Sequence, residues 1–415
     1  MDSDRYCAGE CGGITLKNIT DLKTPASGLR VEEVQDCLVE HSSAITMPPR
    51  FYNDPAIFQF ERQRLFDRSW FPVGHVSEVS KPGDYFTVDF CQEPILIVRD
   101  GRHKLHAFSN VCAHRNFPVA HERGNCNLIK CRYHGWMYNL DGTLRGAPLM
   151  ESAKEFSVND WRLHEFHLEV WRGSIFVNMS RESVTALAPR LVEIDPIFAR
   201  HETDEMIYFK LGDFDVEANW KCVLDIFAEN YHTDTIHEVS LGDSVPARST
   251  IIDETDNAAY CMFTLPSGGG ANLQSPEDYA LGGGFTLPGS LDESDHNVAI
   301  GGVVFPNFSW YFSPDCLFYT EINPQTHDRT TGRWGIGVSP EAVESADFSD
   351  KLEVYKKGSK QVIDEDFWGI VQMSRGKRST FATQGRTSYA EATLWHLHKW
   401  YLQTMQATVP EMFAP

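Results

Sequence analysis

The sequence CAHRNFPVAHERGNCNLIKCRYHGW, from Cys112 to Trp136, holds two cysteines and two histidines in two short pairs. One residue separates Cys112 from His114; sixteen residues later comes Cys131, and two residues separate it from His134. Zinc accepts two thiolates and two imidazoles, but its loops usually pair like with like. A [2Fe–2S] cluster with cysteines on one iron and histidines on the other fits mixed pairs. The spacing alone leaves both centres open.

The region around this segment, from about residue 70 to 180, has the texture of β structure. Short runs of β-branched and aromatic residues (DYFTVDF, PILIVRD, SIFVNMS) alternate with turn signals (KPGD, RDGR, LDGT). This alternation predicts a small antiparallel β domain, in which YNLDGTLRG forms a hairpin. We therefore expect the four side chains on loops of a β domain.

The rest of the chain mixes helical and strand patterns, which predicts an α+β domain. Expected helices lie at 54–70, 219–232, 351–373 and 388–405, and expected strands at 296–314 and 331–340. The glycine-rich stretch at 265–285 does not connect a strand to a helix, so we expect a surface loop and no phosphate site. We expect these domains: an N-terminal arm (1–45), a metal-binding β domain (46–180, whose leading helix at 54–70 can pack on the next domain) and an α+β domain (181–415).

Composition limits the class of protein. The 415 residues include 58 acidic and 37 basic side chains, for a net charge of −21. Nucleic-acid binding needs a basic face, so no such partner is expected. The N-terminal MDSDRYCAGECGG lacks an apolar leader, and no long apolar run is present, so we expect no membrane segment and a cytoplasmic location. The ten cysteines should then remain reduced.

A second cluster of candidate ligands lies in NWKCVLDIFAENYHTDTIH, from Asn219 to His237. Two histidines and one carboxylate can hold Fe(II) on one face and leave other positions open. His232 and His237 are five residues apart, which on a regular helix puts them about 140° out of phase. A shared metal therefore requires a bend around 233–236, and ordinary helix and loop histidines are the alternative reading.

The two segments together resemble the Rieske non-haem iron oxygenases. The first is similar to the Rieske motif, with Asn116 where the family most often has glycine, and the second to that family's NWK…E/D-x-x-H-x4-H signature. The resemblance implies that a [2Fe–2S] cluster is bound by Cys112, His114, Cys131 and His134. It further implies mononuclear Fe(II) on His232 and His237, and catalytic roles for Glu229 and Asn219. In the family, the acid at Glu229 links His232 to the partner subunit's His134.

The third iron ligand is expected in VIDEDFWGIVQMSRGKRSTFATQG. The family pattern is an ED pair followed by QRG and a later glycine. Placing the ligand at Asp366 aligns Gly376 and Gly385 without gaps, whereas Asp364 loses both glycines but aligns a glutamine. We favour Asp366, with Asp364 as the alternative, and read the other two acids as a charged helix start.

The resemblance covers about residues 50–405 and implies a Rieske β domain joined to a helix-grip (START-like) catalytic domain. It implies a terminal oxygenase, mono- or dioxygenase, that takes electrons from a separate NAD(P)H-dependent reductase, with or without a ferredoxin. It also implies a homotrimer or α3β3 assembly. We expect an aromatic compound or organic acid as substrate. The alternatives are oxidation or demethylation of a betaine- or carnitine-like quaternary amine, a Rieske electron-transfer protein, and a zinc-stabilised binding protein. Candidate pocket aromatics are Phe227, Phe305, Trp310, Phe312 and Trp368.

Overall fold

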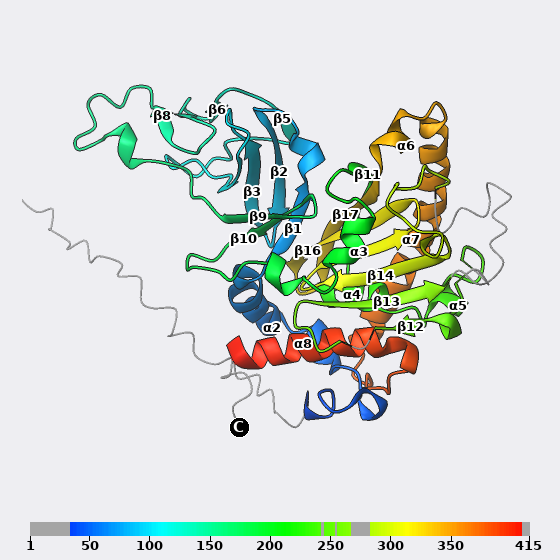
Figure 1. Cartoon of the computed structure of the whole chain (residues 1–415). Coiled ribbons are helices and arrows are strands. Elements are labelled where there is room, and N and C mark those ends of the chain that lie inside the picture. The colour runs from blue at the N-terminus through cyan, green and yellow to red at the C-terminus, as the bar shows by residue number, and fades with distance from the viewer. Residues whose placement is uncertain (1–33, 242–244, 254, 267–282, 409–415) are drawn as a thin grey trace, which may run out of the picture.

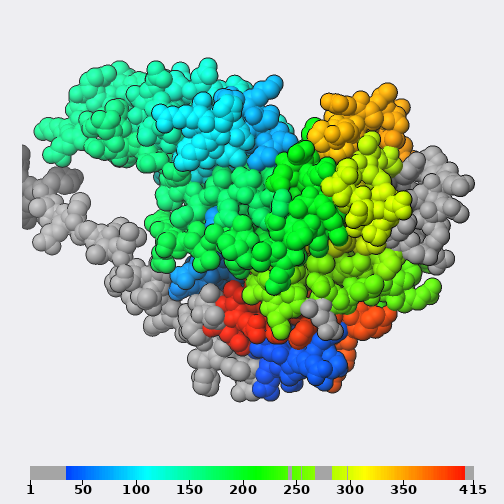
Figure 2. All heavy atoms as spheres, viewed as in Figure 1, coloured from blue at the N-terminus to red at the C-terminus, as the bar shows by residue number. Residues whose placement is uncertain are grey.

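The computed structural model describes residues 34–241, 245–253, 255–266 and 283–408. Most of the expected N-terminal arm and of the glycine-rich stretch at 265–285 lies outside the described residues. A strand-rich lobe stands beside a larger part in which helices cover one antiparallel sheet (Figure 1), and the space-filling view shows the lobe next to the larger part (Figure 2). The expected α+β fold is confirmed. Among the described residues, no helix has both the length and the apolar character that crossing a bilayer requires.

The strand-rich lobe contains three small antiparallel sheets. In sheet order, the first consists of β4 (Leu105–Ser109), β3 (Glu93–Arg99), β2 (Asp84–Phe90) and β5 (Arg123–Asn125). The second consists of β6 (Ile129–Lys130), β7 (Met137–Tyr138) and β8 (Leu144–Gly146), and the third of β1 (Phe71–His75), β10 (Ser174–Asn178) and β9 (His167–Trp171). The expected hairpin is the β7–β8 pair, with Tyr138 opposite Leu144.

The larger part is built on a seven-stranded antiparallel sheet. Its order is β11 (Ile207–Val216), β17 (Arg329–Val338), β16 (Cys316–Thr326), β15 (Phe308–Ser313), β14 (Val298–Val304), β13 (Tyr260–Pro266) and β12 (Ile251–Ile252). The sequence did not predict β12 and β13, because β13 is a short apolar run next to the glycine-rich stretch. Strand β13 pairs with β14 over its whole length, and this tertiary pairing, which the local sequence does not indicate, makes the segment a strand.

Helix α7 (Phe348–Lys377) packs on this sheet in the expected helix-grip arrangement (Figure 1). Phe348, Tyr355 and Ile363 of α7 share a buried cluster with Trp334 and Ile336 of β17. The further helices are α3 (Asp195–Arg200), α4 (Trp220–Phe227), α5 (Thr233–Ile236), α6 (Pro340–Glu344) and α8 (Ala392–Thr408). The helices expected at 351–373 and 388–405 are thus α7 and α8.

The helix expected at 54–70 is interrupted. Asp54 caps α2 (Pro55–Phe60), and a π-helical turn (Glu61–Leu65) and a 3-10 turn (Phe66–Arg68) follow. The turn carries Glu61, which is fully buried and accepts hydrogen bonds from Lys221 (2.5 Å), Tyr401 (2.5 Å) and Trp220 (2.8 Å). Separating the buried pair of Glu61 and Lys221 would leave an uncompensated charge in the core, which is strongly destabilising. The pair therefore fixes this helix against α4 and α8.

Candidate metal centres

The two cysteine–histidine loops have the same backbone structure. In each, the cysteine N–H donates to the carbonyl five residues later, and the N–H four residues later donates back to the cysteine carbonyl. These bonds are 2.9 and 2.9 Å at Cys112 and 2.9 and 3.0 Å at Cys131. One loop follows β4 and the other joins β6 to β7. The sheets therefore present two matching loops to each other.

The position four residues after each cysteine requires a left-handed backbone. Asn116 has φ +56° and Gly135 has φ +75°. Glycine adopts this conformation freely, and asparagine is among the few other residues that adopt it routinely. The departure from the family's usual glycine at Asn116 therefore preserves the loop.

The four expected ligands are brought together. The rings of His114 and His134 are 4.6 Å apart between centroids. Cys112 and Cys131 are buried; burial raises the pKa of the Cys131 thiol, and its hydrogen bond with Cys112 raises it further. The Nδ1 atom of His114 is buried with no hydrogen-bond partner among the described residues. A buried imidazole nitrogen without a hydrogen-bond partner, on a loop that also carries a buried cysteine, fits metal coordination.

Tyr138 is a residue of this site that the sequence analysis missed. Its buried hydroxyl lies 3.2 Å from the Cys112 sulfur and accepts the N–H of Ala113 at 3.0 Å. A cysteine sulfur that binds a metal carries no proton, so in the cluster-bound site the Tyr138 hydroxyl would be the donor to it. The spacing of the metal ligands contains no signal for this contact.

The second site begins where α4 ends. The helix stops at Phe227, not at 232 as expected, and α5 is a single turn flanked by His232 and His237. The change of direction thus lies at 228–232, ahead of the bend expected at 233–236. The Glu229 carboxylate accepts the N–H groups of Tyr231 and His232 and caps the new turn.

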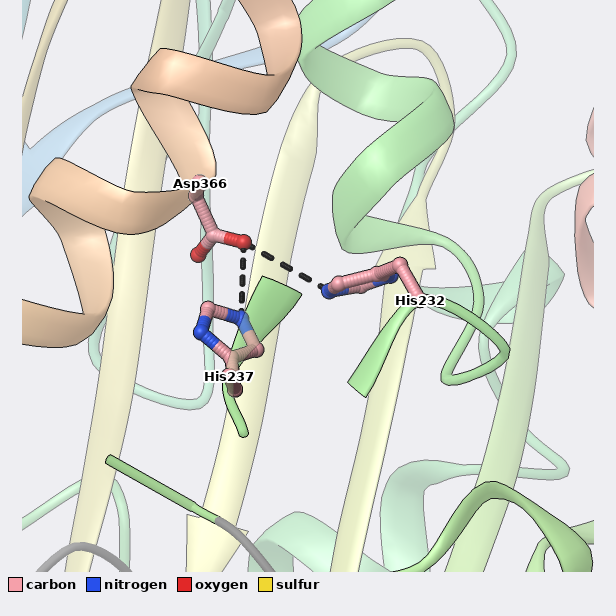
Figure 3. A group of neighbouring side chains, drawn as sticks. All are labelled: His232, His237 and Asp366. Atoms are coloured by element: carbon pink, nitrogen blue, oxygen red, sulfur yellow. Dashed lines mark hydrogen bonds and ion pairs between the residues drawn. The ribbon is translucent and has the colours of Figure 1, made fainter. Parts of the chain in front are cut away.

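His232, His237 and Asp366 converge (Figure 3). The Nε2 atoms of His232 and His237 lie 3.5 and 3.0 Å from Oδ1 of Asp366, and one ligand atom from each lies within 4.8 Å of the others. Asp364 faces elsewhere: it is 61% exposed and pairs with Lys360. The two histidines and Asp366 are a donor set that suits Fe(II).

Each histidine has a carboxylate behind it, at Nδ1. Glu229 Oε1 lies 2.6 Å from Nδ1 of His232, and Glu365 Oε2 lies 2.8 Å from Nδ1 of His237. Burial lowers the pKa of His232, but the charge of Glu229 and hydrogen bonds to Asp366 and Glu229 outweigh it and raise the pKa to about 10. Asp366 is buried, which raises its pKa, but the two histidines lower it overall.

The prediction that two acids mark a helix start was wrong, and the structure gives Asn219 a structural role. Asp364 and Glu365 do not start a helix, because α7 begins at Phe348. Asn219, expected to be catalytic, caps α4: its oxygen accepts the Lys221 N–H at 3.1 Å, and its amide donates to the His327 carbonyl at 2.8 Å. Asparagine is a preferred N-cap, and here both ends of its amide are occupied by backbone.

A cavity of about 140 Å³ adjoins the second site. His232, His237 and Asp366 form part of its wall, and the remainder is mostly apolar, including Phe227, Leu241, Val245, Phe263, Leu265, Phe318 and Ile363. Of the candidate pocket aromatics, Phe227 and Trp310 line it. Phe305 packs on Trp400, Phe312 on Phe198, and Trp368 is 64% exposed on α7. No lysine or arginine is among the described lining residues.

The chain matches two protein families. Residues 198–407, half of its length, match the ring hydroxylating alpha subunit (catalytic domain), and residues 69–159 match the Rieske [2Fe-2S] domain. The chain belongs to the ring-hydroxylating alpha-subunit family. The resemblance to Rieske oxygenases is thereby confirmed, and in this family the Rieske domain carries the cluster and the catalytic domain the mononuclear iron.

Two curated relatives of this chain are named for different substrates. It is 32% identical over 209 residues to the carnitine monooxygenase oxygenase subunit of Escherichia coli K12, which is 49% of this chain and 54% of the relative. It is 29% identical over 217 residues to benzene 1,2-dioxygenase subunit alpha of Pseudomonas putida, 51% of this chain and 48% of the relative. The match thus spans about half the length of these relatives.

The quaternary ammonium Rieske monooxygenase CntA, solved with L-carnitine, has a similar structure. The TM-score is 0.73 at 22% identity, over 91% of this chain and 99% of the other. At this identity the likeness establishes the fold.

Proposed function

We propose that this chain is the terminal oxygenase of a multicomponent system, which uses O2 and externally supplied electrons to oxidise a small organic substrate. The observation that carries the proposal is the convergence of His232, His237 and Asp366 on one wall of an apolar cavity. When bound there, Fe(II) would supply O2 activation at its open positions. The protein's part is to hold the metal, to admit an apolar substrate beside it and to limit water.

The proposed electron route runs between subunits through Glu229. This carboxylate contacts His232 on one side, and its side chain is 9% exposed. Both ends of this route carry an exposed aromatic side chain: Tyr231 (55% exposed) precedes His232, and Tyr133 (50% exposed) precedes His134. Exposed aromatic side chains of this kind suit a subunit interface. A head-to-tail trimer would join them, and a separate reductase, with or without a ferredoxin, would reduce the cluster.

The cavity favours a neutral, apolar substrate about the size of one aromatic ring. A cavity of about 150 Å³ lined by aliphatic and aromatic residues is known to hold benzene, and the volume here is about 140 Å³. A carboxylate buried in this cavity away from the metal would need a partner cation, and no lysine or arginine is among the described lining residues. Of the two substrate classes expected from the sequence, this favours the aromatic compound over the organic acid.

A quaternary amine is the second candidate. Relatives named carnitine monooxygenase and glycine betaine monooxygenase support it. The aromatic side chains of Phe227, Phe263 and Phe318 in the cavity wall support it as well. Aromatic faces attract such cations once both are desolvated.

The test is substrate-dependent oxygen consumption by the purified chain with a surrogate reductase. Benzene and toluene, benzoate, and carnitine and glycine betaine represent the three classes. We expect turnover, with ¹⁸O from O2 in the product, for the neutral aromatics and none for benzoate. His232→Ala should abolish it. Turnover of carnitine alone would select the second candidate, and equal product from His232→Ala would refute the oxygenase assignment.

A further inference from the structure

Glu365, whose carboxylate lies at Nδ1 of His237, has no role in the ligand motif. We propose that Glu365 is a positioning residue for the mononuclear metal: it accepts a hydrogen bond from Nδ1–H of His237, so that Nε2, which lies on the side of Asp366, is the nitrogen left to bind the metal. The proposal rests on the proposed function only in that a metal is bound by the two histidines and Asp366. It adds a second carboxylate–histidine pair to that of Glu229 and His232.

Glu365 is itself held in place. Its Oε2, which lies 2.8 Å from Nδ1 of His237, also accepts a hydrogen bond from the Ser240 hydroxyl at 2.5 Å. Its Oε1 accepts one from the Gln361 amide, one helical turn earlier on α7, at 3.1 Å. Ser240 follows His237 closely in the chain, so Glu365 connects α7 to the segment that carries this histidine. The carboxylate has little freedom to leave the imidazole.

The imidazole needs this acceptor. His237 is 2% exposed, so water has poor access to its Nδ1. A neutral imidazole carries one proton, and the nitrogen that keeps it is set by the hydrogen bond it makes. Without Glu365, the proton could occupy Nε2 and block coordination, or the ring could rotate. Loss of comparable partners behind ligand histidines lowers metal affinity by about 10- to 100-fold.

Glu365 can be replaced without opening the core. Its side chain is 23% exposed and borders a surface groove with Lys357, Lys360 and Trp368. Its neighbour Asp364 is a matched control, because it lies on the same helix but is 61% exposed and pairs with Lys360. Asp364→Asn therefore removes one negative charge from the same stretch of α7 without touching His237.

The experiment is anaerobic titration of the full-length protein, with its cluster intact and its mononuclear metal removed, with Fe(II) and separately with Co(II). We expect the metal dissociation constant to rise at least tenfold in Glu365→Ala and less in Glu365→Gln, whose amide oxygen still accepts from Nδ1. Ser240→Ala should show a smaller rise, and Asp364→Asn none. The Co(II) absorption spectrum should change in Glu365→Ala, which a purely structural role would leave unaltered.

Wild-type affinity and an unchanged Co(II) spectrum in Glu365→Ala would overturn the proposal while leaving the oxygenase assignment intact. If Glu365→Ala fails to fold, wild-type behaviour of both Glu365→Gln and Ser240→Ala would overturn it equally. If the wild-type protein binds no metal beyond what His232→Ala binds, the proposed function fails and this proposal fails with it.

Discussion

Tyr138 illustrates how one side chain can adjust the cluster without binding it. Its hydroxyl lies 3.2 Å from Cys112 Sγ and would donate to that sulfur once cluster binding has removed the thiol proton. A hydrogen bond donated to a ligand sulfur favours the more negative, reduced cluster and raises the reduction potential.

Replacement of Tyr138 by phenylalanine should therefore lower the reduction potential. A hydrogen bond of about 0.5–1.5 kcal/mol corresponds to about 20–65 mV for one electron. Redox titration followed by the cluster's EPR signal measures it. Tyr133→Phe, at an exposed tyrosine nearby, is the control. An unchanged or raised potential in Tyr138→Phe would contradict the donor role.

The charges around His232 make iron uptake depend on pH. In the metal-free site its pKa is raised to about 10 despite burial, chiefly by Glu229 and Asp366, so the imidazole is protonated at neutral pH. Iron needs the neutral imidazole and must displace that proton. Affinity should therefore increase with pH between 6 and 8, by about tenfold per unit for each proton released. Anaerobic Fe(II) titrations at several pH values test this, and a flat profile would contradict it.

Residue spacing indicated which side chains come together at the candidate sites, but not the residues that support them. Asp366 was preferred over Asp364 on the alignment of two glycines, and the structure places Asp366 against both histidines. The N-cap role of Asn219 was not foreseen, because a motif position gives no indication of whether a polar side chain caps its helix. Glu365 was dismissed because adjacency to Asp366 in sequence says nothing about His237, 128 residues away.

At the scale of elements, the two ligand loops are a repeated unit despite different histidine spacing. Their shared hydrogen bonds place Asn116 and Gly135 at equivalent left-handed positions. Sequence comparison of the loops hides this, because only the cysteines align.

The repeat predicts the outcome of substitutions at Asn116. Asn116→Gly should keep the cluster and its stability, whereas Asn116→Val should cost about 1–2 kcal/mol, because a β-branched residue is strained in this conformation. Cluster absorbance per chain and thermal unfolding are the measurements. Equal stability of the valine and glycine variants would show that the loop does not require a left-handed residue.

The end of α4 shows why element boundaries were harder to predict than elements. Apolar periodicity continues from Trp220 to Phe227, and nothing in the following AENYH forbids another helical turn. The stop depends on Glu229 turning back to cap the next turn and on His232 meeting α7. The cap by Glu229 is a local contact, but the contact of His232 with α7 is tertiary, so helix propensity alone could not place the break.

For the whole molecule, the order and type of structure followed from the sequence, but the coupling between its parts did not. Hydrophobic pattern predicted a β domain and an α+β domain. The contacts that join the two include charges far apart in sequence, such as Arg333 of β17, which binds Glu78 at 2.9 Å. No local pattern marks such pairs.

The proposed trimer predicts complementation between inactive chains. His134→Ala should lack a working cluster and His232→Ala a working iron site. Co-expressed, mixed trimers should regain part of the wild-type oxygen consumption, because a cluster of one chain would serve the iron of its partner. Each variant alone is the control. Inactive mixed trimers of confirmed composition would contradict an electron route between subunits.

The account's central claim is that this chain carries a [2Fe–2S] cluster and a separate iron. Quantification of iron and acid-labile sulfide in anaerobically purified protein tests it most directly. We predict about three irons and two sulfides per chain, about two and two in His232→Ala and in Asp366→Asn, and the wild-type values in Asp364→Asn. Zinc in place of iron, absence of sulfide, or three irons retained in both His232→Ala and Asp366→Asn would contradict the account.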